Sequence, residues 1–203
     1  FASYTAPHWP LQAPDEFIAR YEGVYESGYE VIREERLNRI KNLNILNHTT
    51  NPKSSTMWPT WENLTETIRA KETKRMQVYA GMVEALDYHI GRLINTLENI
   101  KELSNTVVIF MSDNGAEGND PQIILENEEW IPANFDNSIN NMGRGNSHIG
   151  YGPRWAEVSS TPFRIFKGFT TEGGIRSPAF VTYPKFKNQQ KISDTFSSVM
   201  DIT

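Results

Sequence analysis

The sequence predicts an α/β fold in which helices and a sheet pack in layers. Apolar residues recur at three- and four-residue spacing over about residues 66–100, which predicts one long amphipathic helix. The strand predicted directly after it, at 106–111, is apolar on both faces, as strands of a helix-covered sheet are. No internal repeat or evident domain boundary divides the 203 residues. A long helix that runs into a buried strand therefore indicates one layered α/β domain, or a large part of one.

A strand, a loop and two helices are expected ahead of the long helix. Residues 1–6 are predicted to end a strand, and the three prolines of "PHWPLQAP" predict a rigid, irregular loop after it. Helices are expected at about 15–22 and 29–46, the second with alternating Glu and Arg on an exposed face. The apolar stripe of the long helix consists of Tyr79, Met82, Val83, Leu86, Ile90, Leu93, Ile94 and Leu97.

The segment after the predicted strand is irregular. Residues 115–160 contain Asn, Gly, Pro and Trp with no sustained period, and so long an irregular segment in a compact domain usually belongs to a functional site or its lid. Residues 163–184, "FRIFKGFTTEGGIRSPAFVTYP", then predict two short strands around a Gly-Gly turn.

Composition excludes several kinds of partner and site. The net charge of −5 offers no basic footprint, so no nucleic-acid partner is expected. No apolar run approaches the roughly 20 residues of a membrane span, so no membrane partner is expected either. The absence of cysteine excludes a disulfide framework, a zinc–thiolate site and a cysteine nucleophile within these residues. Glycosylation sequons at Asn47 and Asn63 are expected by chance in this composition and do not locate the protein in a compartment.

Asp113, Asn114 and Gly115 end the predicted strand at 106–111. Open α/β sheets collect their ligands at the carboxyl ends of strands. Asp supplies a charged oxygen and Asn a neutral one, which is the ligand set of hard cations such as calcium or magnesium. Gly115 would let the backbone turn sharply beside the ion. The alternative is an ordinary turn, because Asp-Asn-Gly is also common turn chemistry.

His8 and Lys167 are the other candidate site residues. His8 lies in the proline-rich loop just past a predicted strand end, where it could bind an anion or protonate a leaving group. The alternative for His8 is packing against Trp9. Lys167 lies among apolar residues in "RIFKGF", where a lysine suits an oxyanion. The alternative for Lys167 is a place on the polar face of an edge hairpin.

Three segments taken together are more specific than any single motif. They are "APHWPLQAP", "MSDNGAEG" and "YGPRWAEVSSTPFRIFKGFTTEGGIRSPAFV". In this order they resemble the arylsulfatase family, within the alkaline-phosphatase-like superfamily, and the resemblance covers nearly the whole chain, with residues 28–75 matching least clearly. The resemblance implies an α/β sandwich with helices on both faces of a mixed sheet. It also implies hydrolysis of a sulfate ester substrate.

The same resemblance implies a role for each candidate residue. Asp113 and Asn114 look like two ligands of the family's single divalent cation, usually calcium. Lys167 looks like the lysine that binds the sulfate oxygens. His8 looks like the histidine that hydrogen-bonds the ester oxygen and helps the alcohol leave. Both His8 and Lys167 are therefore expected to bind the substrate as well as to act in catalysis.

The resemblance further implies that residues 1–203 are a fragment of a single sulfatase catalytic domain and are inactive alone. The remaining metal ligands and the nucleophile are expected in an N-terminal part outside this chain, and a C-terminal end is expected to follow it. The family's nucleophile is a formylglycine made from the first residue of a Cys/Ser-x-Pro-x-Arg motif. Residues 160–164 fit that short pattern, but they lie in the lysine-bearing segment, so the fit is interpreted as a coincidence.

Two alternatives to a sulfatase remain open at this level. A phosphodiesterase or phosphonate hydrolase of the same superfamily would also suit the Asp-Asn pair, and the nucleophile segment would be needed to separate these activities. A non-catalytic, sulfatase-like binding protein is the other alternative. The presence of His8, Asp113, Asn114 and Lys167 together favours an enzyme over that relative.

Overall fold

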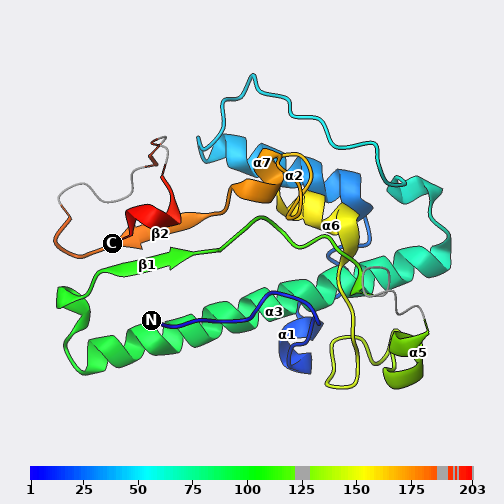
Figure 1. Cartoon of the computed structure of the whole chain (residues 1–203), viewed down its shortest axis with the longest axis horizontal. Coiled ribbons are helices and arrows are strands. Elements are labelled where there is room, and N and C mark those ends of the chain that lie inside the picture. Colours follow the sequence, from blue (N-terminus) through cyan, green and yellow to red (C-terminus); the bar gives the residue numbers. More distant parts are fainter. Residues whose placement is uncertain (122–128, 187–191, 194, 196, 203) are drawn as a thin grey trace.

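Helix α3 (Glu66–Asn99) runs along the length of the molecule, and the other elements are arranged around it (Figure 1). The computed structural model describes residues 1–121, 129–186, 192, 193, 195 and 197–202. The other described helices are α1 (Asp15–Ala19), α2 (Gly28–Asn42), α5 (Trp130–Asn134), α6 (Gly152–Ser159) and α7 (Glu172–Ile175), and the strands are β1 (Val108–Met111) and β2 (Ala179–Thr182). Short 3-10 turns lie at Trp61–Asn63, Leu103–Asn105 and Val199–Asp201.

Helix α3 confirms the predicted long helix. It begins at an N-cap, because the Thr65 Oγ1 accepts the N–H of Ile68 at 3.3 Å. Its buried residues gather between Met76 and Gly81, whereas Val83 and Leu93 of the predicted stripe are 39% and 43% exposed. The stripe is therefore only partly covered in the second half of the helix. Neither α3 nor any other described helix is long and apolar enough to cross a membrane.

The region before α3 differs from the prediction at its start. Helices α1 and α2 confirm the two helices expected there, and α2 ends at Asn42, a turn earlier than expected. The predicted strand end at residues 1–6 was wrong, since these residues have no regular structure. A strand exists only through hydrogen bonds to a neighbour, and no described residue pairs with this segment.

The core is built around Trp155 of α6. This side chain is fully buried, and its Nε1 donates to the Glu72 carbonyl oxygen at 3.0 Å. The rings of Tyr29 and Tyr25 meet it edge-on, with centroids 4.7 and 5.7 Å away. Edge-to-face aromatic packing of this kind adds to the free energy gained by burial. Helix α6 is thus joined to α2 and α3 through one indole ring.

The prediction that residues 115–160 are irregular was wrong at α6. Helix α6 has only 8 residues, about two turns, which is too short for a sustained period, and its charged residues Arg154 and Glu157 are buried and do not mark a solvent-facing side. Helix α5 also lies in this segment, and residues 122–128 of it are outside the described part of the chain.

Strands β1 and β2 form an antiparallel pair in which Val108 faces Thr182 and Met111 faces Ala179. The position of β1 confirms the strand predicted after the long helix.

The prediction of two strands around a Gly-Gly turn was wrong for the first strand, because only β2 is formed there. Gly173 and Gly174 instead lie in α7, buried against the carbonyl oxygens of residues 165 and 169, and this close packing is what requires glycine.

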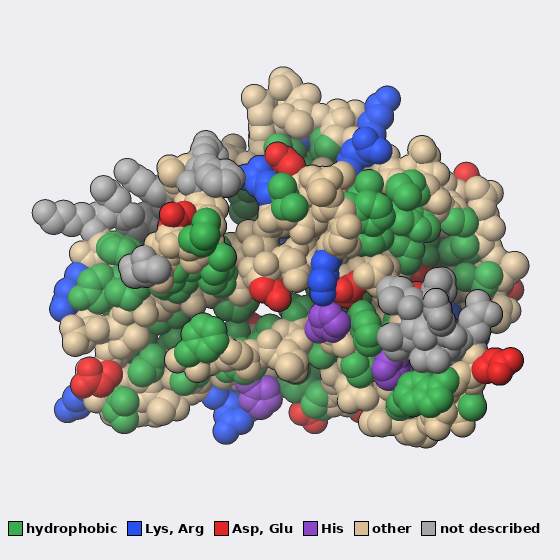
Figure 2. Space-filling view, viewed as in Figure 1, with side chains coloured by type: hydrophobic (Ala, Val, Ile, Leu, Met, Phe, Trp, Pro, Cys, Tyr) green, Lys and Arg blue, Asp and Glu red, His purple; other side chains and the backbone are tan. Residues whose placement is uncertain are grey.

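The strand pair is open to solvent. Phe180 and Val181 of β2 are 56% and 52% exposed, and Ile109 of β1 is 44% exposed. Figure 2 shows hydrophobic side chains gathered at the left of the molecule, where Figure 1 places these strands. The predicted α/β class is confirmed, and this antiparallel pair represents the sheet in the residues that the structure describes.

Candidate active site

Three side chains from distant parts of the chain meet: His8, Glu117 and Lys167. The Lys167 Nζ lies 2.8 Å from the Glu117 Oε2 and 3.3 Å from the His8 Nε2. The His8 Nε2 lies 3.6 Å from the same Glu117 oxygen. His8 and Lys167 were both predicted as site residues, and the structure brings them together across 159 positions of sequence.

The ring of His8 is held by the main chain of its own loop. Its Nδ1 lies 2.7 Å from the Trp9 carbonyl oxygen, and since a carbonyl can only accept, Nδ1 carries a proton. Nε2 is therefore the nitrogen that remains for Lys167 or for a substrate. The His8 and Trp9 rings also lie 5.1 Å apart, so the packing considered as an alternative accompanies the contact with Lys167 and does not replace it.

Lys167 lies in a turn and not on a strand of an edge hairpin. Its backbone N–H donates to the Ala116 carbonyl oxygen at 2.9 Å. The preceding Phe166 is only 2% exposed, and its ring lies 5.2 Å from the ring of Trp58. The lysine side chain itself is 33% exposed. The turn is thus anchored in the core while the ammonium reaches solvent.

Glu117 is the member of this cluster that the sequence did not single out. Its carboxylate is only 9% exposed, and its Oε1 accepts the N–H of Asn119 at 2.9 Å. Its place shortly after a strand end was a signal, because functional residues of α/β sheets collect there. A lone glutamate in a Gly-containing loop is nevertheless indistinguishable from a solvated surface charge until its partners are known.

Asp113 and Asn114 lie just beyond the end of β1, as predicted. Asp113 is exposed, and its carboxylate makes no hydrogen bond or ion pair with other described residues. The Asn114 Nδ2 donates to the Gly115 carbonyl oxygen at 2.9 Å, which leaves Oδ1 as the acceptor of the amide. A carboxylate and an amide oxygen with no competing partner fit a hard divalent cation.

These two residues could supply only part of a coordination shell. Within residues 1–121, 129–186 and the described positions beyond, no group of three or more His, Asp or Glu side chains is arranged to hold a metal ion. Calcium takes six to eight oxygen ligands in proteins. A cation here would therefore need oxygen ligands from elsewhere.

Gly115 brings the loop after β1 against the segment that carries Lys167. Its N–H donates to the Gly174 carbonyl oxygen at 3.2 Å, and a Cβ at Gly115 would lie only 1.9 Å from the Gly173 oxygen. Its φ is outside the left-handed region, so glycine is required by this close approach and not by the sharp turn that was predicted. Ser112 continues the contact, with its N–H donating to the Pro178 oxygen at 3.2 Å.

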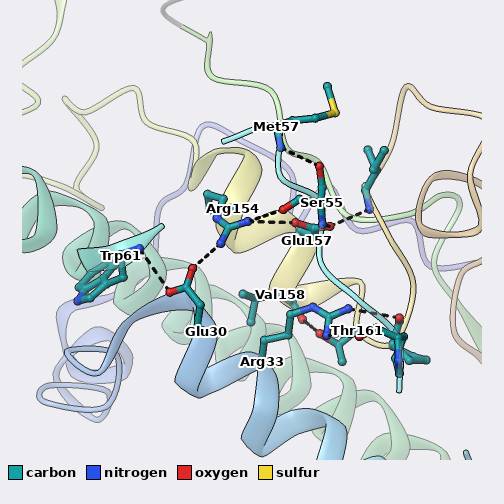
Figure 3. A network of polar contacts seen from close by, with 12 residues as sticks. Glu30, Arg33, Ser55, Met57, Trp61, Arg154, Glu157, Val158 and Thr161 are labelled. Atoms are coloured by element: carbon teal, nitrogen blue, oxygen red, sulfur yellow. Dashed lines mark hydrogen bonds and ion pairs between the residues drawn. The ribbon is translucent and has the colours of Figure 1, made fainter. Parts of the chain in front are cut away.

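The buried carboxylate of Glu157 is bonded to the backbone just before Lys167, and Figure 3 shows the polar network around it. Glu157 of α6 is 1% exposed, and its Oε1 accepts the N–H of Ser55 at 2.6 Å and the N–H of Ile165 at 3.4 Å. Arg154, one turn earlier, pairs with Glu157 and also with Glu30 of α2. Ile165 is two positions before Lys167, so the hydrogen bond to Glu157 anchors the backbone next to Lys167.

Ser160, the first residue of the short pattern that resembles a nucleophile motif, follows the end of α6. Its Oγ is buried and has no hydrogen-bond partner among the described residues. A nucleophile has to face the substrate, so this burial supports the interpretation of residues 160–164 as a coincidence.

The whole chain matches one protein family. A family model described as Sulfatase matches residues 1–203. The chain belongs to the sulfatase family. This confirms the family predicted from the three segments, and with it the α/β class to which sulfatases belong.

Two sulfatase relatives show how much of a protein these residues represent. The chain is 47% identical to an uncharacterized sulfatase of Schizosaccharomyces pombe, over 100% of this chain and 37% of that protein. It is 38% identical to the arylsulfatase of Klebsiella aerogenes, over 98% of this chain and 43% of that protein. The crystal structure of Ps i-CgsB aligns with 90% of this chain and 22% of its own chain, at a TM-score of 0.42 and 25% identity. The chain thus spans about two fifths of the length of its sulfatase relatives.

Proposed function

We propose that the protein hydrolyses sulfate esters and that residues 1–203 form part of its catalytic domain. The observation that carries this proposal is the 3.3 Å contact between Lys167 and His8, beside the loop that bears Asp113 and Asn114. The positive Lys167 ammonium and the proposed proton donor His8, next to the oxygen ligands of Asp113 and Asn114, suit an anionic ester substrate. Membership in the sulfatase family, and 38% identity to an arylsulfatase, support a sulfate ester as that substrate.

The complete catalytic domain extends beyond this chain in our proposal. The lengths of the two relatives support it, because these residues correspond to 37% and 43% of them. The remaining cation ligands and a formylglycine nucleophile would lie in the N-terminal part, and the 203 residues alone would be inactive. The absence of cysteine here and the enclosed Ser160 hydroxyl agree with a nucleophile located elsewhere.

Lys167 binds the sulfate oxygens in this proposal. Its side chain is 33% exposed while its backbone N–H is bonded to the Ala116 carbonyl oxygen, so a partly exposed side chain carries the charge from an anchored backbone. A fixed positive charge stabilises the negative charge on sulfate without reorganisation during the reaction.

His8 donates a proton to the leaving oxygen. The Trp9 carbonyl holds the Nδ1 proton, so the donated proton is the one on Nε2 of the imidazolium form. When the S–O bond breaks, its electron pair goes to the ester oxygen, which takes this proton and leaves as the neutral alcohol. His8 is left as the neutral imidazole, still bonded through Nδ1 to Trp9.

Asp113 and Asn114 would hold one divalent cation, which we infer to be calcium. Both residues offer oxygen atoms, and neither oxygen has a competing partner among the described residues. Such a cation, when bound, supplies a positive charge beside the reacting groups.

The test uses the full-length protein with 4-nitrophenyl sulfate, bis(4-nitrophenyl) phosphate and a phosphonate ester. We expect wild type and the exposed control Lys185→Ala to turn over the sulfate ester, and Lys167→Ala to do so with a much lower kcat/KM. A higher kcat/KM for the diester or the phosphonate would identify another hydrolase of the superfamily. Absence of turnover of all three, with intact cation binding, would identify a non-catalytic relative.

A further inference from the structure

Glu117 lies beneath the two side chains that face the substrate. Its carboxylate is 9% exposed, whereas the side chains of Lys167 and His8 are 33% and 43% exposed. One oxygen, Oε2, contacts both the Lys167 Nζ at 2.8 Å and the His8 Nε2 at 3.6 Å. Within the cluster, the negative Glu117 carboxylate is therefore the most buried group, and Lys167 and His8, which can carry positive charge, are nearer to solvent.

The Glu117 carboxylate is itself fixed in orientation. Its second oxygen, Oε1, accepts the N–H of Asn119 at 2.9 Å, so the two oxygens have separate roles. The segments that carry Glu117 and Lys167 are already joined by the hydrogen bond from the Lys167 N–H to the Ala116 oxygen. The Glu117–Lys167 ion pair is therefore not needed to hold the two segments together. Its main effect is to fix the position of the Lys167 ammonium group.

We propose that Glu117 is a positioning residue that aims Lys167 and His8 at the substrate; this rests on the sulfatase function proposed above. An ammonium has three N–H groups. In the structure one is directed to Glu117 and one to the His8 Nε2, which leaves the third for an anion outside the cluster. Without Glu117 the flexible lysine side chain would have no such constraint.

Glu117 also gives the imidazolium form of His8 a partner before the reaction. Once Nε2 is protonated it can no longer accept from Lys167, and two positive groups then lie 3.3 Å apart. The negative charge on the shared Glu117 oxygen, 3.6 Å from Nε2, offsets this repulsion until the ester oxygen takes the proton. Glu117 thus acts through the two catalytic side chains and does not itself contact the substrate.

The central variant is Glu117→Gln in the full-length protein. Glutamine keeps the shape and an oxygen for the Asn119 N–H, and it removes the charge. We expect kcat/KM for an aryl sulfate to fall by at least about tenfold, mainly in kcat, because the catalytic groups are misplaced and not lost. The matched control is Glu98→Gln, the same substitution at an exposed position of α3, which should stay within about twofold of wild type.

A double-mutant cycle separates positioning from a merely structural role. If Glu117 acts through Lys167, then Glu117→Gln should cost clearly less kcat/KM when added to Lys167→Ala than the roughly tenfold or greater loss expected in wild type, and the remaining cost is the part that acts through His8. Losses that simply multiply in the double variant would indicate a structural role and would overturn the inference.

A crystal structure of Glu117→Gln provides a readout that does not depend on turnover. We expect the separation of the Lys167 Nζ and the His8 Nε2 to increase from 3.3 Å, or the lysine side chain to lose its ordered position, while Glu98→Gln keeps the contact. An unchanged cluster in Glu117→Gln would overturn the inference. Wild-type protein that turns over no sulfate ester would sink the proposed function, and the crystal structures would still decide the role of Glu117.

Discussion

Lys167 and His8 place Nζ and Nε2 3.3 Å apart, although 159 positions separate them in the sequence. The lysine is fixed through its backbone to Ala116, and the histidine is fixed through Nδ1 to the Trp9 oxygen. Each side chain thus has one end held and one end facing the same point. In our proposal the two act on one ligand, and their contributions to its conversion can be separated experimentally.

His8→Ala should slow the enzyme more as the leaving alcohol becomes more basic. A proton donor matters little for a nitrophenol, which leaves easily, whereas loss of general-acid catalysis for an alkyl or sugar sulfate should cost on the order of a hundredfold or more. Lys167→Ala should instead raise KM and lower kcat/KM about equally along the series, because in our proposal Lys167 binds the sulfate group of every substrate. The measurement is log kcat/KM against leaving-group pKa, with His48→Ala as the exposed control.

Equal slopes for wild type and His8→Ala would show that His8 does not assist departure. His8 would then have only a structural role, packing against Trp9 and contacting Lys167. A slope that steepens in Lys167→Ala as well would mean that the two residues cannot be assigned separate roles.

Asp113→Ala should abolish calcium binding by the full-length protein, and Asn114→Ala should weaken it less. The first removes a charged oxygen and the second a neutral one, and charge dominates the affinity for a hard cation. Isothermal titration calorimetry with calcium measures both, and Asp87→Ala on α3 is the exposed control. Wild-type affinity in Asp113→Ala would mean that Asp113-Asn114-Gly115 forms a turn and no metal site.

Much of the fold, and two of the three side chains in the cluster of His8, Glu117 and Lys167, could be predicted from the sequence. Helix α3 was predictable because one side of it is exposed, which produces a period in the residues. Helix α6 was not, because it has only 8 residues and buries its charged Arg154 and Glu157. Glu117 was missed because its importance lies in its distance from His8 and Lys167, which no local pattern contains. Gly115 was noticed for its freedom to turn, but the reason for glycine there is contact with Gly173.

Glu157→Ala should lower the free energy of unfolding by about 3–5 kcal/mol, the usual cost of breaking a buried ion pair. The variant leaves the buried N–H groups of Ser55 and Ile165 without their acceptor. Glu157→Gln should cost less, since Oε1 can still accept from both, and Arg154 keeps its partner Glu30. Urea unfolding followed by circular dichroism measures the difference, with Glu34→Ala on the exposed face of α2 as control. A decrease in the free energy of unfolding of less than about 1 kcal/mol would show that the Glu157 network contributes little to stability.

Tyr25 should make the protein lose stability in alkaline solution. Burial against Trp155 raises the pKa of Tyr25 from its ordinary value of 10.0 to about 12. Between these two values the unfolded chain releases the phenol proton and the folded chain keeps it, so stability is complete below pH 10 and falls as pH rises toward 12. Unfolding measured from pH 9 to 12 should therefore show a shallower decline in Tyr25→Phe than in wild type. Identical declines would mean that this phenol titrates normally in the folded protein.

The antiparallel register of β1 and β2 has a consequence for where the chain can change in length. Met111 faces Ala179, and the hydrogen bonds that continue from this pair through Ser112 and Gly115 reach the segment of Lys167. Each residue of a strand advances about 3.4 Å, so one residue inserted or deleted on this side of the pair would shift one loop past the other by more than a hydrogen-bond length. The opposite end of the strand pair, before Val108 and after Thr182, lies away from that junction. Length variation among related chains is therefore expected to collect at that opposite end, with the spacing from Met111 to Gly115 and from Gly174 to Ala179 kept constant.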